Sequence, residues 1–502
     1  MSMPAENLNI PITLDSLLEG IADAPAIPVS GISADSRTLR PGELFIACQG
    51  ASSHGLDYLG KVVAAGAAAV AWDSSTGSAV DADVPMIPVA DLQHHLGEIA
   101  NRWFDFPSRS VRVIGVTGTN GKTTVAWLLR QCLNRLDRRC AYIGTVGYGL
   151  DDIEHEGSMT TPACIELHRM LAEFRDQGAS LAAIEVSSHA LEQSRVDGVS
   201  FDAAIFTNLS RDHIDYHGSM QAYFESKAGL FLDFDVRSRI VSLDTDYGTE
   251  LANRCGPNVV TVSTRFDRVA NGRPYVFVRA VVANPEGSRV SVTSSWGNVE
   301  FDLPLPGDFN VANAAEVLAL LLCQDVPLAD AAAVLATVTA PPGRMEHVKA
   351  VQSGAPAVYV DYSHTPASLE AALRALRGHC GGKLWCVFGC GGDRDRGKRA
   401  MMGKVAARLA DNAVVTSDNP RTEDPQRIIS DILEGMGDGV VTIADRAEAI
   451  AYAISGAGAE DTVLIAGKGH EDYQVIGTQR LEFSDVHVAR RCLSELSGTE
   501  GQ

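Results

Sequence analysis

The sequence has no closely paired cysteines, no long apolar segment and no excess of positive charge. Its ten cysteines are scattered over 502 residues, and none forms the CxxC spacing of a zinc site; the nearest pair, Cys386 and Cys390, ends in a glycine-rich turn. No apolar run is long enough to span a membrane. The first twenty residues lack the basic flank and apolar centre of a signal peptide. These absences predict a reduced, soluble, cytoplasmic protein.

Negative charge dominates, because 63 Asp and Glu outnumber 42 Lys and Arg and give a formal net charge of −21. This balance argues against non-specific binding to nucleic acid or to an anionic membrane, although a local basic pocket could still hold an anion. Apolar residues make up 45% and charged residues 21%, which excludes a largely disordered chain. At roughly 150 residues per domain, the length predicts about three domains.

The central part of the chain alternates short apolar runs with polar loops. VRVIGV (111–116), LAAIEV (181–186) and DAAIF (202–206) are too short for helices, and each ends in a polar loop. Apolar residues at helical spacing follow the first run, from Val125 to Leu136. The pattern predicts a parallel sheet with crossover helices. Residues 258–303 instead alternate and are rich in Val, Ser and Thr, which predicts an antiparallel patch.

The same rhythm returns four times in the last third of the chain, in AVYVDYSHTP, LWCVFGCGGDRD, AVVTSDNPR and TVLIAGKGHED. In open α/β sheets, ligands bind outside the carboxyl ends of the strands, where all four of these polar loops are expected. Pro107 and the turn at 341–344 are plausible boundaries. We therefore expect domains over residues 1–106, 107–340 and 341–502.

A glycine-rich loop, GVTGTNGKTT, lies between the first strand and its helix. Gly118 and Gly121 would let the backbone N–H groups face a phosphate, Lys122 would reach the β- and γ-phosphates, and the Thr123 hydroxyl would bind Mg²⁺. Val116 stands where the usual pattern has its first glycine. The alternative is an ordinary turn with a surface lysine, but the flanking elements favour binding of ATP or GTP.

TGTNGKTT resembles the nucleotide loop of the Mur ligase family, the ATP-dependent amide-bond-forming enzymes of peptidoglycan synthesis. The likeness runs from Ser36 to Ser484 and includes, in order, EVSSH, TNLSRDHIDYH, GDFNVAN, GRME, DYSHTP, GCGGDRDRGKR, DNPR and GKGHEDYQ. It implies a three-domain α/β ligase. An N-terminal domain would bind a uridine nucleotide, a central parallel-sheet domain would bind ATP, and a Rossmann-like C-terminal domain would bind an amino acid.

The resemblance implies a nucleotide and metal site. It assigns ATP to Gly118, Thr119, Asn120, Gly121, Lys122, Thr123, Thr124, Asn310, Arg344 and Asp361, with Asn313 beside them. It assigns Mg²⁺ to Thr123, Glu185, His213 and a carbamylated Lys227, and catalysis to Lys122, Glu185, His213 and Lys227. From the residues alone, Glu185 could cap a strand, His213 could be a loop residue, Lys227 could be a surface lysine, and Asn310 and Asp361 could cap helices.

The acceptor substrate implied by the resemblance is a UDP-N-acetylmuramoyl dipeptide. Its expected contacts are Ser36, Gly50, Ala51, Ser52, Thr160, Thr161, Ser187, Gln193 and Arg195. Met159 stands where many relatives have Asn, which puts one polar contact in question. Loops rich in Ser and Thr are otherwise common without any ligand.

DNPR resembles the signature of the diaminopimelate-adding members of the family. The pocket implied for meso-diaminopimelate comprises Arg394, Asp418, Asn419, Pro420, Arg421, Gly467 and Glu471. Arg394 and Arg421 offer guanidinium groups for carboxylates, and Glu471 offers an anion for an ammonium. Without the resemblance, DNPR would be a proline-containing turn with a solvated arginine.

The expected reaction has two steps: ATP phosphorylates the D-glutamate γ-carboxylate, and the amine of diaminopimelate displaces phosphate. We expect a monomer with no nucleic-acid partner. Three alternatives stay open, namely a lysine-adding ligase, a ligase similar to folylpolyglutamate synthase, and a nucleotide-binding switch without an acyl acceptor.

Overall fold

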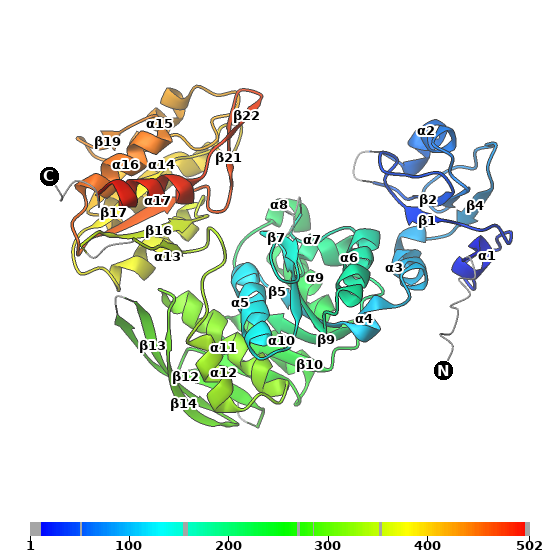
Figure 1. Ribbon diagram of the computed structural model, residues 1–502, viewed down its shortest axis with the longest axis horizontal. Coiled ribbons are helices and arrows are strands. Elements are labelled where there is room, and N and C mark those ends of the chain that lie inside the picture. The colour runs from blue at the N-terminus through cyan, green and yellow to red at the C-terminus, as the bar shows by residue number, and fades with distance from the viewer. Residues whose placement is uncertain are drawn as a thin grey trace, which may run out of the picture. The chain divides into compact units, whose positions relative to one another are not determined.

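The structure is a computed structural model that describes residues 12–50, 53–153, 159–268, 272–284, 286–350 and 354–496 (Figure 1). The chain forms two compact units. Residues 1–119 and 137–239 make up the first, and residues 120–136 and 240–502 make up the second. Each unit is described in turn.

The N-terminal part of the first unit is a four-stranded parallel sheet in the order β1-β2-β3-β4. Alternate residues of β2 enter opposite cores, as the period of a strand requires. Leu44 and Ile46 pack with residues of α1 and α3, whereas Phe45 and Ala47 pack with Val62 of α2, and Figure 1 shows these helices on opposite faces of the sheet. The elements are α1 (Leu14–Leu17), β1 (Gly31–Ser33), β2 (Glu43–Ala47), η1 (Gly55–Tyr58), α2 (Leu59–Ala64), β3 (Ala69–Asp73), β4 (Met86–Val89) and α3 (Leu92–Trp103).

The rest of the first unit contains strands in the order β9-β5-β8-β6-β7. All neighbours pair in parallel except β6 and β7, so the predicted parallel sheet is confirmed. The elements are α4 (Pro107–Ser110), β5 (Arg112–Thr117), β6 (Cys140–Gly144), β7 (Gly147–Gly149), α6 (Cys164–Asp176), β8 (Leu181–Glu185), α7 (Ser188–Glu192), β9 (Phe201–Phe206), α8 (Ile214–His217) and α9 (Met220–Leu232). The loops after β5, β8 and β9 therefore leave the same edge of this sheet.

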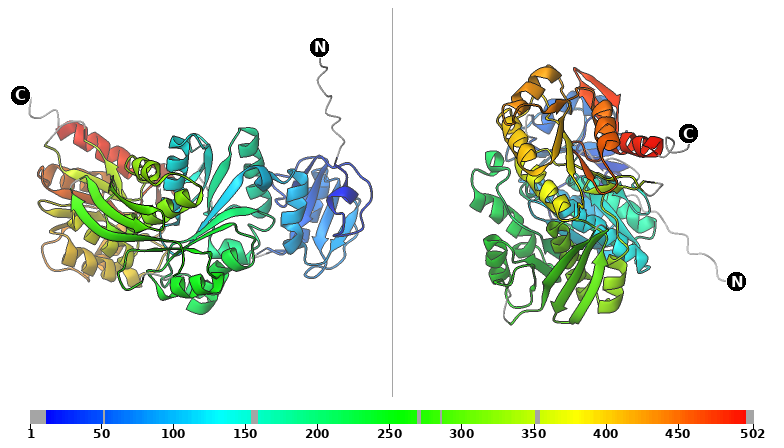
Figure 2. Two further views of the ribbon diagram at one scale, coloured as in Figure 1. Left: turned by 90° about the horizontal axis from the view of Figure 1, so that it is seen from below. Right: turned by 90° about the vertical axis from the view of Figure 1, so that its left-hand side faces the viewer.

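The second unit begins with α5 (Lys122–Arg135), which packs against α11 and α12. Its strands run in the order β14-β13-β12-β11-β10 and include the long green strands of Figure 2. The prediction of an antiparallel patch is wrong for β11, which pairs in parallel with both β10 and β12; only β12, β13 and β14 pair antiparallel. The elements are β10 (Ser238–Ser242), α10 (Asp246–Cys255), β11 (Val260–Ser263), β12 (Tyr275–Asn284), β13 (Gly287–Ser294), β14 (Gly297–Leu303), α11 (Asp308–Cys323) and α12 (Leu328–Leu335).

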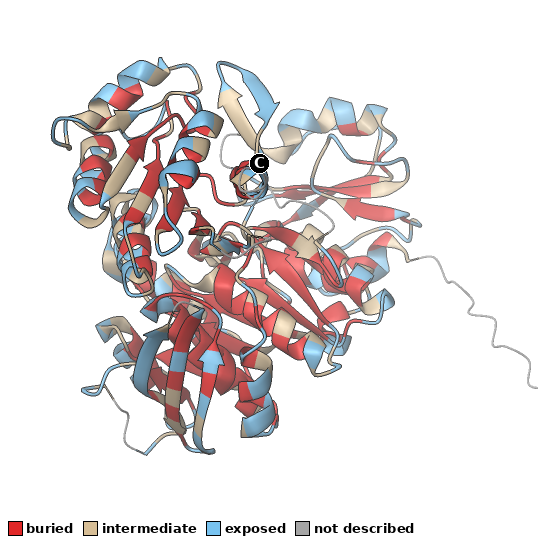
Figure 3. Ribbon diagram, turned by 60° about the vertical axis from the view of Figure 1, so that its left-hand side comes forward, coloured by how far each residue is buried: buried red, intermediate tan, exposed pale blue. Residues whose placement is uncertain are grey.

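The C-terminal part of the second unit is a six-stranded sheet in the order β15-β16-β20-β17-β18-β19. All pairs are parallel except β15 with β16. Its strands are largely buried (Figure 3). The elements are β15 (Glu346–Val348), β16 (Ala357–Asp361), α13 (Pro366–Arg377), β17 (Leu384–Phe388), α14 (Gly397–Leu409), β18 (Asn412–Val415), α15 (Pro425–Leu433), β19 (Val441–Thr442), α16 (Arg446–Gly456), β20 (Thr462–Ala466), β21 (Tyr473–Ile476), β22 (Gln479–Glu482) and α17 (Asp485–Leu496).

The four predicted strands of the last third are β16, β17, β18 and β20, and their polar loops follow their carboxyl ends as expected. Among the residues that the structure describes, no helix is both long and apolar enough to cross a membrane.

Candidate functional site

The glycine-rich loop begins at the carboxyl end of β5, where only glycine fits. Gly118 has φ 148°, and a Cβ there would collide with the Thr207 side chain of the loop after β9. The hydroxyl of Thr119 accepts from the Ser210 amide at 3.0 Å and lies 3.2 Å from the hydroxyl of Tyr223. The start of the loop is therefore fixed by its neighbours in the first unit.

Lys227 lies under this loop and is not a surface lysine. It is 1% exposed, and its Nζ donates to the carbonyl oxygen of Gly118 at 2.9 Å. The ammonium also lies 4.7 Å from the ring of Tyr223, one helical turn earlier in α9. The fold thus brings a buried cation to the backbone of the glycine-rich loop, 109 positions away in the sequence.

Glu185 ends β8 and is fully buried. Its Oε1 accepts from the Tyr142 hydroxyl at 2.6 Å and the Thr145 amide at 2.9 Å, and its Oε2 accepts from the Thr145 hydroxyl at 3.2 Å. Sequence reasoning missed Tyr142 and Thr145, because only the pairing of β6 with β8 brings them to this carboxylate.

The oxygen ligands of Glu185 and the nearby hydroxyls are of the hard type that Mg²⁺ prefers. Within the described ranges, however, there is no group of three or more His, Cys, Asp or Glu side chains arranged to hold a metal ion. A Mg²⁺ here would need phosphate and water oxygens in addition to protein ligands, which is the usual way this ion is bound.

His213 belongs to a cluster of aromatic and imidazole rings. Its ring centroid lies 5.1 Å from that of His189 and 6.0 Å from that of Tyr223. Burial lowers the pKa of His189, and the neighbouring imidazoles of His213 and His217 lower it further. His217 is held by a 2.9 Å contact to Ser188. Tyr223 therefore connects His213 to the glycine-rich loop.

Four of the predicted acceptor-binding residues form one network in the first unit. The Thr161 hydroxyl donates to the backbone oxygen of Glu185 at 2.7 Å and accepts from the Ser187 amide at 3.1 Å. Arg195 donates to the backbone oxygen of Thr161 at 3.0 Å and to the Gln193 side chain at 2.6 Å. These residues converge beside the carboxyl end of β8.

The other predicted acceptor contacts are less connected. Thr160 lies 3.2 Å from the Thr145 hydroxyl, Ser36 lies in the turn after β1, and the Gly50 amide closes a turn onto Ser53 at 2.9 Å. Ala51 and Ser52 lie outside the described residues. Met159 is 42% exposed.

In the second unit, α5 presents its N-terminus directly after Gly121, which has φ 87°. Lys122 is its first residue, and Thr123 and Thr124 are buried in its first turn. The partial positive charge of a helix N-terminus favours an anion here. Asn310 and Asn313 lie on the helix α11 that packs on α5, and the Asn313 amide donates to Asn310 at 3.3 Å.

Asp361 and Arg344 meet at the end of β16. Asp361 accepts from the Met345 amide at 2.8 Å and from the Ser363 hydroxyl, and burial raises the pKa of its carboxyl. The Arg344 guanidinium lies 4.7 Å from the ring of Tyr362. Its buried Nε has no hydrogen-bond partner among the described residues.

The DNPR loop after β18 and the GKGHED loop after β20 are tied together by buried side chains. Asn419 donates to Glu471 Oε2 at 2.8 Å, and its Oδ1 accepts from the Val475 amide at 2.9 Å. Lys468 donates to Asn419 Oδ1 at 3.1 Å and forms an ion pair with Glu471 Oε2 at 2.9 Å. Sequence reasoning missed Lys468.

Arg394 and Arg421, which are predicted to bind a carboxylate of the substrate, lie on either side of Gly391. A Cβ on Gly391 would lie 2.9 Å from Arg421 Nη1 and 3.7 Å from Arg394 Cγ. Arg421 has φ 51° and is fixed by a 2.9 Å hydrogen bond to the Gly392 carbonyl and a 3.0 Å bond from its amide to Val475. The structure therefore brings Arg394 and Arg421 together.

Asp418 and Gly467 rest on a buried ion pair that the sequence did not reveal. A Cβ on Gly467 would lie 2.5 Å from Asp418 Oδ2. Beneath them, the fully buried Arg446 makes two 2.7 Å bonds to Asp485 and donates to the Ala466 carbonyl at 3.0 Å. This pair supports the carboxyl ends of β18 and β20.

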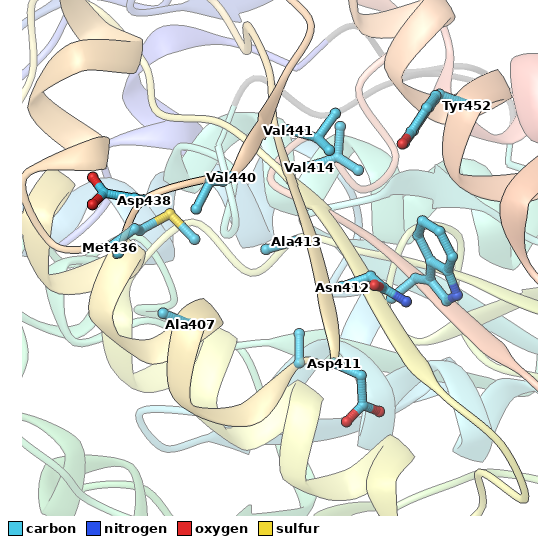
Figure 4. Close-up of a pocket in the computed structure, with 14 residues that line it drawn as sticks. Ala407, Asp411, Asn412, Ala413, Val414, Met436, Asp438, Val440, Val441 and Tyr452 are labelled. Atoms are coloured by element: carbon cyan, nitrogen blue, oxygen red, sulfur yellow. The ribbon is translucent and has the colours of Figure 1, made fainter.

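A cavity of about 280 Å³ lies elsewhere in the C-terminal part (Figure 4). The strand residues Asn412, Val414 and Val441 line it. Further lining side chains come from the helices α14 and α16. It adjoins the start of β18, the end opposite to the DNPR loop. Since ligands in open α/β sheets bind at carboxyl ends, this cavity is not the candidate site.

The fold and its loops define an α/β protein with a glycine-rich loop after a central strand of one parallel sheet and polar loops at the carboxyl ends of a second, Rossmann-like sheet. Sequence models of three domains match the chain: the Mur ligase family, catalytic domain over 28–104; the Mur ligase middle domain over 116–321; and the Mur ligase, glutamate ligase domain over 343–469. The chain belongs to the Mur ligase family.

Individual relatives match nearly the whole chain. A UDP-N-acetylmuramoyl-L-alanyl-D-glutamate–2,6-diaminopimelate ligase of Alkalilimnicola ehrlichii is 44% identical over 95% of this chain and 97% of the relative. The ligase of the same name from Pseudomonas putida is 45% identical over 92% and 94%. A solved structure of a ligase with this name has a TM-score of 0.73 and 33% identity, covering 97% of this chain and 100% of that one. The family and the three-domain α/β fold class predicted from the motifs are confirmed.

Proposed function

We propose that this protein is an ATP-dependent ligase that adds meso-2,6-diaminopimelate to the D-glutamate γ-carboxylate of UDP-N-acetylmuramoyl-L-alanyl-D-glutamate. The observation that carries the proposal is the pair Arg394 and Arg421 around Gly391, together with Glu471, which is bonded to Asn419 of the same loop as Arg421. Two cations and one anion complement the far end of diaminopimelate, which carries a carboxylate and an ammonium, whereas lysine carries only the ammonium there. Relatives with this name, similar over more than nine-tenths of the chain, support it.

The reaction takes two steps. The γ-carboxylate oxygen attacks the γ-phosphorus of ATP, which gives an acyl phosphate and ADP. The amine of diaminopimelate then attacks the acyl carbon, and the tetrahedral intermediate expels phosphate and releases a proton. We assign the ATP phosphates to residues 118–124, and the nucleoside to Asn310, Arg344 and Asp361. Positioning and charge neutralisation would carry the rate.

We assign Mg²⁺ to Thr123, Glu185, His213 and Lys227, together with phosphate oxygens. When bound, the ion would neutralise charge that develops between carboxylate and phosphate. Thr161, Ser187, Gln193 and Arg195 would orient the acceptor. Residues 1–106, 107–340 and 341–502 would bind uridine nucleotide, ATP and amino acid respectively, in a cytoplasmic monomer.

Lys227 would act as a carbamate, formed when its amine adds CO₂ and loses a proton. A carbamate N–H could keep the bond to the Gly118 carbonyl, now 2.9 Å long, while its two oxygens supply negative charge for a metal. Native mass spectrometry of Lys227→Ala against the wild type should show loss of one labile CO₂. A fully active enzyme with a free ammonium at this position would contradict the assignment.

The test of the function is phosphate release by the purified protein with ATP, the dipeptide nucleotide and one amine at a time. Release should require both the nucleotide and diaminopimelate, and lysine should serve poorly. Equal use of lysine would favour the lysine-adding alternative. Release without any amine would favour a nucleotide switch, and release with a folate and glutamate would favour the folylpolyglutamate synthase-like alternative.

A further inference from the structure

We propose that Lys468 is the positioning residue of the amine site, a buried ammonium that fixes Asn419 and one oxygen of Glu471 so that the other oxygen receives the substrate ammonium. The inference rests on the proposed function, because it assumes that an amine substrate binds between the DNPR and GKGHED loops.

The geometry of Lys468 is that of a bridge between two loops. Its side chain is fully buried, and its Nζ reaches Asn419 Oδ1 at 3.1 Å and Glu471 Oε2 at 2.9 Å. Asn419 lies 49 positions earlier in the sequence. The ammonium also lies 5.3 Å from the ring of Tyr473. Lysine suits this place, because it offers several donors around one point charge.

The hydrogen bonds of Glu471 divide its two oxygens between structure and ligand. Oε2 accepts from both Lys468 and Asn419, whereas no hydrogen bond within the described part of the chain engages Oε1. The Glu471 side chain is 17% exposed, so the carboxylate still reaches solvent. Two donors on Oε2 restrain rotation of the carboxylate, so Oε1 presents an oriented acceptor to an ammonium.

Arg421 depends on the same bridge. Asn419 Oδ1 accepts from the Val475 amide, and the Val475 carbonyl accepts from the Arg421 amide. Lys468 therefore supports both the anion and one of the cations of the proposed pocket. A misplacement of about 1 Å of a positioned group can lower the rate of an enzyme roughly 10²-fold. Loss of the Lys468 bridge should therefore weaken the use of the amine without changing the KM for ATP.

The experiment compares Lys468→Met, Lys468→Arg, Glu471→Gln and the double variant Lys468→Met with Glu471→Gln. Lys468→Met should raise the KM for diaminopimelate about 10- to 100-fold, with the KM values for ATP and the dipeptide nucleotide within about twofold. Lys468→Arg, which keeps the charge, should recover part of this loss. The matched control is Lys404→Met, an exposed lysine of α14, which should change nothing.

The double variant tests whether Lys468 acts through Glu471. If Lys468 acts through Glu471, the diaminopimelate KM of the double variant should match that of Glu471→Gln alone within about threefold, because the effects of coupled substitutions are not additive. An amine KM within about twofold of the wild type in Lys468→Met, or fully multiplicative effects, would overturn the inference. Thermal unfolding checks folding; if Lys468→Met does not fold, Lys468→Gln takes its place under the same criteria.

Failure of this inference is distinguishable from failure of the proposed function. A wild-type protein that does not ligate diaminopimelate refutes the function. A wild-type protein that does, with an amine KM raised by Glu471→Gln but unchanged by Lys468→Met, refutes only the role of Lys468.

Discussion

The central site and the C-terminal site hold their buried charges in different ways. In the first unit, Lys227 donates to a backbone carbonyl, and Glu185 accepts from hydroxyls and an amide. In the C-terminal part, Arg446 is bonded twice to Asp485, and Lys468 is paired with Glu471. Dipoles therefore contribute to the support of the first pair of charges, whereas opposite charges hold the second pair together.

The difference predicts that a charge held by dipoles acts directly on a ligand, whereas an ion pair first places the loops around one. A dipole fixes a charge without changing the net charge of the site, so the field stays available to a substrate. An ion pair largely cancels its own field but holds two loops together, and breaking it leaves a buried charge without its partner. Substitutions of the first kind should therefore reduce turnover, and those of the second kind should reduce stability or placement.

Lys122→Ala should give the largest effect and the cleanest loss of turnover. Lys122 begins α5 and is only partly buried, so its removal costs the fold little. Charges that stabilise a transferring phosphoryl group are worth about 10³- to 10⁵-fold in kcat, and we expect a loss of that size. Ligation assays measure the loss of turnover, and thermal unfolding checks that the variant still folds. Near-normal turnover in a folded variant would refute the role of the loop.

Arg446→Met should give the opposite result, a loss of stability. The side chain is fully buried with Asp485, and removing one partner of such a pair typically costs about 3–5 kcal/mol. Urea unfolding of the full chain measures the change, with Arg490→Met, an exposed arginine of α17, as the control. A variant as stable as the control would show that this pair does not hold the carboxyl ends of β18 and β20.

Arg421→Ala should separate the two amines. Truncating a buried charge partner costs about 2–5 kcal/mol, so kcat/KM for diaminopimelate should fall by roughly 30- to 4,000-fold. Lysine use should change much less, because lysine has no distal carboxylate. Both amines are assayed at saturating ATP and dipeptide nucleotide, with the exposed Arg427→Ala as the control. An equal fall of kcat/KM for both amines would show that Arg421 does not bind the distal carboxylate.

Local patterns were enough to predict β5, β8, β9 and the four C-terminal strands β16, β17, β18 and β20, together with the helix after the glycine-rich loop and the loops at the carboxyl edges. They were not enough for β11, whose alternation of Val, Thr and Ser is the same in parallel and antiparallel pairing. They also missed Tyr142, Lys468 and Arg446, because each acts across strands or loops that are neighbours only in the folded sheet. Motif residues such as Lys227 were recognised through the family, although their side chains alone predicted a solvated surface.

Glu316 is a buried carboxyl group with one oxygen that lacks a hydrogen-bond partner among the described residues, and it gives the smallest and most specific prediction. It lies in α11, is 1% exposed, and its Oε2 has no hydrogen-bond partner among the described residues. Burial raises its pKa well above the ordinary value, and the nearby Asp244 raises it further. The folded state therefore keeps a proton that the unfolded state loses above about pH 4.5. Because the unfolded state then binds fewer protons, stability from this group falls as pH rises toward the folded pKa.

Glu316→Met, which keeps the length of the side chain and removes the carboxyl, should therefore stabilise the protein at neutral pH. We expect a gain of about 1–3 kcal/mol at pH 8, the usual cost of an unsatisfied buried polar group, and a smaller gain near pH 5. Urea unfolding at both pH values measures the difference in the free energy of unfolding between variant and wild type. The contributions of other titrating groups cancel in this difference. Glu19→Met, which changes an exposed carboxylate, is the control and should show no such trend. A variant that is less stable at pH 8, or a gain that does not grow with pH, would mean that Glu316 is ionised and supported in the folded protein.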